Sequence, residues 1–302
     1  MISIREVITK IADWRAKDIQ IHKLSGGLTN QNYRVVVNGR NYMVRIPGSE
    51  TELLLIDRKN EYKNSVIAGQ SGVAPKVIYY LKSEEVMVQE FIQGKNVTIE
   101  MMQNEASILK VAESVYRLRQ GLAFSSTFNM FRVMGKYIKI LKERKIKISE
   151  GYLEEGQPAA KQIEIAVNKH PQPLVACHND IWPENIIDYG SKFYIIDFEL
   201  SGNNDPYFDL GNIAAECDYD EDQIAALCKA YCGHEDPAKL ARIQLYAIMS
   251  DLGWTGWTLI QNHISSVDFD YWKFANFRWQ RVRKKINSDR FAIWLETAAP
   301  GS

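Results

Sequence analysis

Two short segments carry most of the information on fold and chemistry in this sequence: His178-Asn179-Asp180-Ile181-Trp182-Pro183-Glu184-Asn185 and, further on, Asp197-Phe198-Glu199. Apolar strand-like runs, LVAC and FYII, precede the two segments, and the turn YGSK between them is short enough to bring Asn185 and Asp197 together. Asp180 ends a loop, where a carboxylate can orient or deprotonate an incoming hydroxyl. Asn185 and Asp197 offer oxygen ligands of the kind that Mg²⁺ accepts. The pattern indicates phosphoryl transfer, which needs positioning and charge neutralisation more than covalent chemistry.

A simpler interpretation is that these polar residues only form two turns, since Asp, Asn and Pro are common turn formers. The sequence upstream argues against it. It predicts an amphipathic helix over residues 1–20, then strands at about 20–25, 32–37 and 41–46, with Asn38-Gly39 as a hairpin turn. A helix from Thr51 to about Gly69 and two more strands within 75–94 complete a small five-stranded lobe.

This small lobe contains the candidate nucleotide contacts. The segment Ser25-Gly26-Gly27-Leu28-Thr29-Asn30 lies between the first two strands, where backbone N–H groups of Gly27, Thr29 and Asn30 can cover phosphates. Arg45 lies on the third strand and Glu61 in the following helix, so they can form an ion pair; an ordinary surface pair is the alternative. The backbone of the apolar strand 86–92 can hydrogen-bond an adenine edge.

The rest of the chain is mostly helical. Helices are expected at about 100–120, 131–145, 157–169, 221–232, 236–262 and 268–287. We therefore expect an α+β protein with two packed lobes: residues 1–94, which cover the nucleotide, and residues 95–302, which contain the catalytic loop and the substrate pocket.

Composition and charge exclude several classes of protein. The 37 Lys and Arg residues balance the 37 Asp and Glu residues, so bulk charge gives no reason to expect a nucleic-acid or anionic-membrane partner. No uncharged apolar stretch approaches ~18 residues, the N-terminus has charges every few residues, and four cysteines are too few for a disulfide scaffold. We expect a cytoplasmic protein with small-molecule partners, and leave its oligomeric state open.

The spacing H-x-D-x₄-N and the later D-F resemble the catalytic loop and the metal-binding triplet of protein kinases, with Glu199 in place of Gly. Four segments are more closely similar to choline/ethanolamine kinases, within the aminoglycoside phosphotransferase and choline kinase group: GGLTNQNY (26–33), HNDIWPEN (178–185), IIDFELSGNNDPYFDLGN (195–212) and WTGW (254–257). This resemblance implies a protein-kinase-like bilobal fold, with ATP as co-substrate and Mg²⁺ as cofactor.

The resemblance also implies roles for individual residues. Asp180 is the expected catalytic base, and Asn185 and Asp197 are the expected Mg²⁺ ligands. Arg45 is expected to contact phosphate. The backbones of Glu90 and Ile92 are expected to contact adenine, and Asp209 to brace the catalytic loop.

The acceptor is expected to be a small molecule, because no long loop after Asp197 is available to hold a peptide. Trp254 and Trp257 are three residues apart, so they share a helix face, although such spacing is more often found in cores. The resemblance implies that they form an aromatic wall for the ammonium of choline, together with Phe274. Glu216 would supply charge and Trp272 is a further candidate, whereas Trp279 and Trp294 are expected to be packing residues.

Other readings of the same site stay open. An ethanolamine kinase would need more carboxylates and fewer rings, because a primary ammonium has three N–H donors. A thiamine or aminoglycoside kinase would differ mainly in the width of its pocket. A nucleotide-binding pseudokinase is the alternative that is not an enzyme.

Overall fold

A computed structural model describes residues 2–24, 30–48, 55–265 and 267–298. The small lobe contains an antiparallel sheet whose strands lie in the order β1 (Ile19–Lys23), β2 (Asn30–Val37), β3 (Arg40–Pro47), β5 (Val86–Glu90) and β4 (Val77–Leu81). The expected five-stranded sheet is confirmed. Asn38 and Gly39 have φ angles of 47° and 79°, the left-handed conformation that a two-residue hairpin turn requires.

One face of this sheet is covered by α1 (Ile4–Lys10) and by Trp14, which is almost fully buried and contacts Tyr42. The prediction of a helix over residues 1–20 was wrong in length. The helix begins with a capping box between Ser3 and Glu6 and ends at Lys10; a short 3₁₀ turn, Ala12–Trp14, then directs the indole under the sheet.

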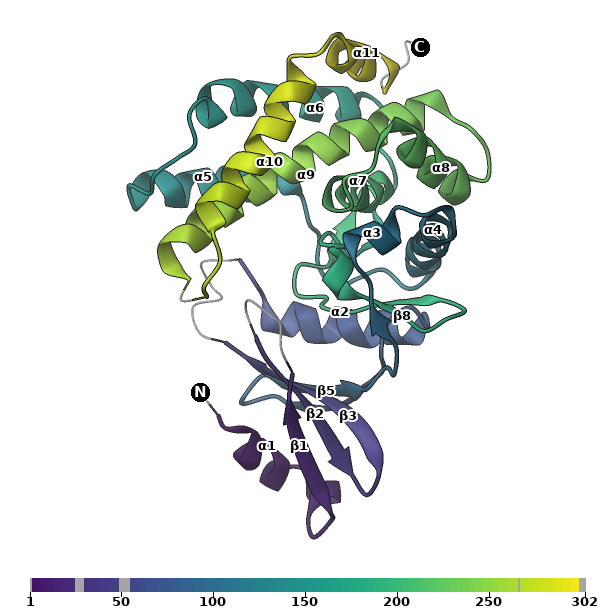
Figure 1. Cartoon of the computed structure of the whole chain (residues 1–302), viewed down its shortest axis with the longest axis vertical. Coiled ribbons are helices and arrows are strands. Elements are labelled where there is room, and N and C mark those ends of the chain that lie inside the picture. Colours follow the sequence, from purple (N-terminus) through teal and green to yellow (C-terminus); the bar gives the residue numbers. More distant parts are fainter. Residues whose placement is uncertain (1, 25–29, 49–54, 266, 299–302) are drawn as a thin grey trace.

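Helix α2 (Arg58–Gln70) lies between the sheet and the helical lobe (Figure 1). The expected start at Thr51 was wrong: residues 51–54 lie outside the described part of the chain, Leu55 has a φ of 63°, and the helix begins at Arg58. Asp57 caps it, accepting hydrogen bonds from the backbone N–H groups of Lys59 and Asn60.

The helix expected at 100–120 is divided in two. Asn104 accepts a hydrogen bond from the Ser107 N–H at 2.9 Å and so starts a new helix, because an Asn side chain in this role replaces the missing intrahelical partner. The helices of this part of the chain are α3 (Ile99–Met102), α4 (Glu105–Gln120), α5 (Met130–Glu143) and α6 (Gln157–Lys169), the last preceded by a π-helical turn, Tyr152–Gly156.

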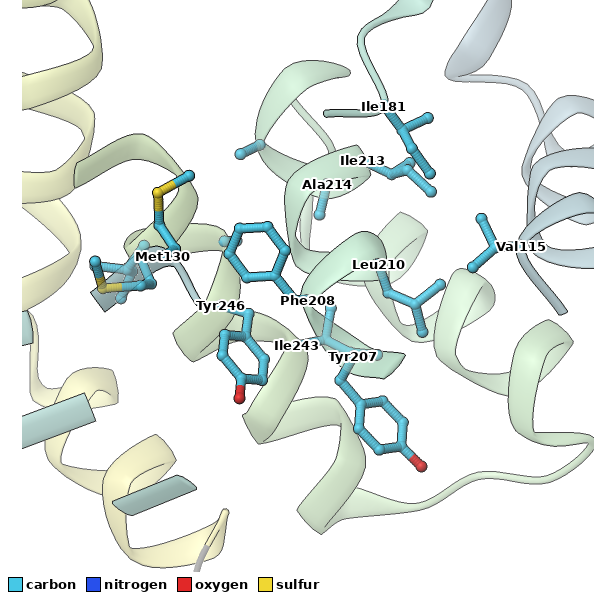
Figure 2. Packing of buried hydrophobic residues seen from close by; sticks show 14 of the residues in the cluster. Val115, Met130, Ile181, Tyr207, Phe208, Leu210, Ile213, Ala214, Ile243 and Tyr246 are labelled. Carbon is cyan, nitrogen blue, oxygen red and sulfur yellow. The ribbon is translucent and has the colours of Figure 1, made fainter. Parts of the chain in front are cut away.

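The C-terminal helices form the core of the large lobe: α7 (Pro206–Glu216), α8 (Glu221–Cys232), α9 (Pro237–Ile264), α10 (Tyr271–Ile286) and α11 (Asp289–Thr297). Helices α7 and α9 lie against one another at Gly211, where a Cβ atom would lie 2.6 Å from the backbone of Tyr246. Figure 2 shows Tyr246 beside Phe208 in this packing. Trp279 is fully buried and Trp294 packs against the same core, as expected.

Short strands connect the lobes and carry the polar motifs. Strand β7 (Val175–Cys177) pairs with β10 (Gly202–Asn204), while β6 (Lys95–Asn96), β8 (Ile186–Asp188) and β9 (Phe193–Ile195) form a second small sheet. The pairing of β8 with β9 confirms the turn predicted at YGSK. At the crossing, a Cβ on Gly94 would lie 2.5 Å from the carbonyl oxygen of Asp188, so the two segments touch through their backbones. No helix in the described ranges is long and apolar enough to cross a membrane.

Candidate active site

The loop 178–185 is held by helix α7. The carboxylate of Asp209 accepts hydrogen bonds from the backbone N–H groups of His178, at 2.9 Å, and Asn179, at 2.7 Å. Asn212, one turn further along α7, accepts from the N–H of Ile181 at 2.5 Å. Asn179 has a φ of 69°, a left-handed conformation that Asn tolerates better than most residues. Two turns of one buried helix therefore determine the conformation of the loop on both sides of Asp180.

Asp180 is partly buried among other carboxylates. Burial raises its pKa well above the usual value, and the charges of Glu216, Asp197 and Glu199 raise it further, while the Arg278 guanidinium opposes the shift. The Asn185 side chain donates to the Asp180 carbonyl oxygen at 3.1 Å. Asp180 is thus a carboxyl group with increased proton affinity, which is the property of a general base.

The second motif lies directly beside the first. The N–H of Ile196 donates to the Asn185 carbonyl oxygen at 2.9 Å, and the His178 Nε2 lies 2.9 Å from the Ile196 carbonyl oxygen. Asp197 follows with a φ of 70°. Burial lowers the pKa of His178 to about 4, so this ring is neutral at physiological pH and serves as a structural link.

Asn185 and Asp197 fit a magnesium site. Because the Asn185 amide NH₂ donates to Asp180, its side-chain oxygen is the remaining acceptor, and Asp197 adds a carboxylate from the adjacent segment. Mg²⁺ is usually bound through one or two protein oxygens together with waters and substrate phosphates. The two side chains have the right chemistry for that arrangement.

Arg45 lies at the centre of a buried ion cluster. Its guanidinium contacts Glu61 at 3.0 Å, Asp197 at 2.5 Å and Glu199 at 3.0 Å. Arg58 joins the cluster through Glu61, at 2.7 Å, and Glu199, at 3.3 Å. The predicted Arg45–Glu61 pair is confirmed, and the alternative of a surface pair was wrong, since both side chains are buried. Burial and the neighbouring Asp197 raise the pKa of Glu199 to about 7.

The other residues predicted to contact the nucleotide lie in two places. Gly27 and Thr29 lie outside the described residues, whereas the Asn30 side chain donates to Glu199 at 3.2 Å. Glu90 and Ile92 line a pocket of about 330 Å³ where the chain crosses between the lobes. Aromatic side chains form most of its remaining wall: Tyr42, Phe91, Tyr189 and Tyr194.

Glu216 lies at the end of α7, buried, and accepts a hydrogen bond from Arg278 at 2.6 Å. The Arg278 guanidinium also lies 4.7 Å from the ring centre of Phe274 and 6.0 Å from that of Trp182. The two rings meet edge to face, with their centres 6.1 Å apart. The structure thus brings together the expected Phe274 and Glu216 with two residues that the sequence interpretation had missed, Trp182 and Arg278.

The tryptophans of α9 and α10 form a second group. Trp254 and Trp257 contact one another edge to face at 6.2 Å, and Trp257 and Trp272 pack against a cluster that contains the fully buried Tyr137. Burial raises the pKa of the Tyr137 phenol, as do the charges of Asp180 and Glu199, which connects this cluster to the catalytic loop. The Lys147 ammonium lies 4.1 Å from the Trp272 ring centre, so that ring already contacts a cation.

Beside Glu199 and Tyr137 lies a pocket of about 280 Å³. Its other lining residues come from the start of α2, the start of α5 and the segment after Asp197, among them Asn60, Asn129, Arg132 and Leu200. Tyr137 belongs to the region 120–175, in which no motif marked a functional residue.

Comparisons with known proteins point to one family. A family model described as choline/ethanolamine kinase matches residues 21–232. The crystal structure of a choline/ethanolamine kinase family protein from Mesorhizobium loti is 31% identical, covers 98% of each chain and superimposes with a TM-score of 0.87. Protein LicA of Haemophilus influenzae is 27% identical over 82% of this chain and 75% of its own. Ethanolamine kinase 2 of Rattus norvegicus is 25% identical over 90% and 77%, respectively.

Proposed function

Because this chain belongs to the choline/ethanolamine kinase family, whose members are small-molecule kinases with a protein-kinase-like bilobal fold, we propose that it transfers the γ-phosphoryl group of ATP to the hydroxyl of choline. The products are phosphocholine and ADP. The same proposal assigns residues 1–94 to a nucleotide-covering lobe and residues 95–302 to the lobe that binds the acceptor.

Asp180 is the base in this proposal. Its carboxylate accepts the proton of the choline hydroxyl while the hydroxyl oxygen attacks the γ-phosphorus and the bond to the leaving ADP breaks. A raised pKa suits this role, because the carboxyl must bind the proton well enough to take it in the transition state. The hydrogen bonds from His178 and Asn179 to Asp209 hold the loop in place, so little reorganisation is needed.

The nucleotide is bound by groups of both lobes. Arg45, held by Glu61, supplies a cation for the phosphates, with the backbone of Gly27, Thr29 and Asn30 above them. The backbones of Glu90 and Ile92 recognise adenine. Asn185 and Asp197 would hold Mg²⁺, which neutralises phosphate charge when it is bound.

Choline is favoured over ethanolamine because the acidic side chains near the proposed acceptor site already accept hydrogen bonds from an arginine. Glu216 and Asp251 both accept hydrogen bonds from Arg278, so they offer few remaining acceptors for the three N–H donors of a primary ammonium. A quaternary ammonium has no N–H donors and so needs no hydrogen-bond acceptors. It is recognised by aromatic faces and by carboxylates at a distance, as Trp254, Trp257, Trp272 and Phe274 with Glu216 would provide.

A coupled assay of ADP release tests the proposal on choline, ethanolamine, thiamine and kanamycin. We expect the highest kcat/KM with choline, and we expect Asp180→Asn to lower kcat by roughly 10²–10⁴-fold while ATP still binds. Turnover of kanamycin with none on choline would contradict the proposal. A higher kcat/KM with ethanolamine would assign the acceptor to ethanolamine instead. ATP binding with no turnover of any acceptor would indicate a pseudokinase.

A further inference from the structure

Asp251 is a buried carboxylate to which the proposed reaction assigns no part in the transfer of the phosphoryl group. It lies on α9, fully buried, three residues before Trp254 and therefore on the same face of that helix. Its oxygen Oδ1 is 3.0 Å from Arg278 and 2.6 Å from Arg281, and its Oδ2 accepts from the Nε of Arg281 at 2.7 Å. One carboxylate thus binds two arginines of α10.

These groups form a row of alternating charge that ends at the acceptor side of the site. Glu216, Arg278, Asp251 and Arg281 follow one another in hydrogen-bond contact, and Arg281 also reaches Asp218, 3.2 Å away, whose side chain is 65% exposed. Burial lowers the pKa of Lys285, on the last turn of α10, and the charges of Asp251 and Asp218 oppose this shift. Buried charges of this kind are weakly screened by salt, so each one contributes to the potential in the neighbouring pocket.

The balance of this row depends on Asp251. Without Asp251, Glu216 alone would balance the charge of Arg278, whose guanidinium lies beside the rings of Trp182 and Phe274. Asp251 shares Arg278 with Glu216, so two carboxylates face one guanidinium at the point where the rings converge. Arg281 binds Asp251 through two hydrogen bonds, at 2.6 and 2.7 Å, and also contacts the exposed Asp218, so it lies further along the row than Arg278.

We infer that Asp251 is a specificity-determining residue for the acceptor: by sharing the charge of Arg278 it makes the potential beside the rings more negative, so that a cationic alcohol is preferred over a neutral one. This inference rests on the proposed function. Asp251 acts through Arg278 and Glu216 and need not touch the acceptor, so it is a positioning residue. A unit charge at roughly 10 Å, at an effective dielectric of about 20, changes ligand binding by roughly tenfold.

Asp251 could instead serve only to pack α9 against α10. The two roles differ in their dependence on acceptor charge. 3,3-Dimethylbutan-1-ol has the shape of choline, with carbon in place of the ammonium nitrogen, and carries no charge. Loss of packing would weaken the binding of both alcohols, whereas loss of a negative charge would weaken only that of choline.

The experiment compares the full-length wild type with Asp251→Asn. We expect the KM for choline to rise roughly tenfold, with the KM for ATP and for 3,3-dimethylbutan-1-ol changed less than twofold. Asp218→Asn is the matched control, since it removes a carboxylate from the same row at its exposed end, and we expect a change below twofold. Arg281→Gln removes a positive charge from the same row, so we expect it to lower the KM for choline. This variant replaces Asp251→Asn in the experiment if circular dichroism shows that Asp251→Asn is unfolded.

Equal increases of KM for choline and for the neutral alcohol in Asp251→Asn, or an increase for choline in Arg281→Gln, would overturn the inference. The proposed function fails separately, when the wild type itself phosphorylates no amino alcohol. Calorimetric titration of choline into the wild type and Asp251→Asn then decides the inference: weaker binding only in the variant supports it, and equal binding or no binding overturns it.

Discussion

We expect the replacement of Asp209 by Asn to lower the activity of this protein while its stability changes little. The fully buried carboxylate accepts two backbone N–H groups, and the Asn side chain can accept only one of them. The orphaned N–H costs about 1–3 kcal/mol. In the opposite direction, burial raises the pKa of Asp209 to about 6, which corresponds to a cost of about 3 kcal/mol for the charged form at neutral pH.

These two effects nearly cancel. We expect the free energy of unfolding of Asp209→Asn to stay within about 2 kcal/mol of the wild type, measured by urea denaturation at pH 7.5. We expect kcat to fall by about 10²-fold, because the loop next to Asp180 loses half of its anchor and a small misplacement of a reacting group has this effect. Asp222→Asn, on the exposed first turn of α8, is the control and should change neither quantity.

Two outcomes would refute this reasoning. A kcat equal to that of the wild type would show that the Asp209 hydrogen bonds do not position the loop. A loss of more than about 4 kcal/mol would show that the ionised carboxylate is a net source of stability, against the direction of its pKa shift.

Two further predictions concern stability. Burial lowers the pKa of His178 to about 4, so as the pH falls the unfolded state binds a proton on this ring before the folded state does. The contribution of His178 to the free energy of unfolding is therefore complete above about pH 6.5 and is lost toward pH 4. At pH 5 about 2 kcal/mol of it is lost. The difference in unfolding free energy between wild type and His178→Gln should therefore shrink from pH 7.5 to pH 5, and an unchanged difference would contradict it. Gly211→Ala should destabilise the protein by at least about 1–3 kcal/mol, because the added Cβ would overlap the Tyr246 backbone. Gly135→Ala, in open space on α5, should stabilise the protein by about 0.4–1 kcal/mol. Thermal melts that show equal shifts for the two variants would refute the packing argument.

The parts of the site that could be predicted from sequence are those set by short-range rules. The residue types and spacing of the loop 178–185, and the turn before Asp197, place their side chains together through local pairing of β8 with β9. Asn38-Gly39 fixes its hairpin in the same local way. The Arg45–Glu61 pair follows from the register of strand and helix in a fold that the motifs had indicated.

The rest depends on tertiary packing. Trp182 is far from Phe274 and Arg278 in the sequence, and the placement of α10 against the loop brings the three side chains together. Helix ends were misplaced for a different reason. Asp57 and Asn104 are capping residues within otherwise helical sequence, and a cap is decided by whether its side chain finds the backbone N–H groups two or three residues on.

The ion cluster around Arg45 has a thermodynamic consequence for the whole molecule. Arg45, Arg58 and Glu61 come from the small lobe, and Asp197 and Glu199 from the large one. Pulling the lobes apart would separate the guanidinium groups of Arg45 and Arg58 from the carboxylates of Asp197 and Glu199. Each lobe would then expose to solvent charged groups that form ion pairs across the boundary in the folded protein. We therefore expect the small lobe and the large lobe to unfold as one cooperative unit, with a single calorimetric transition.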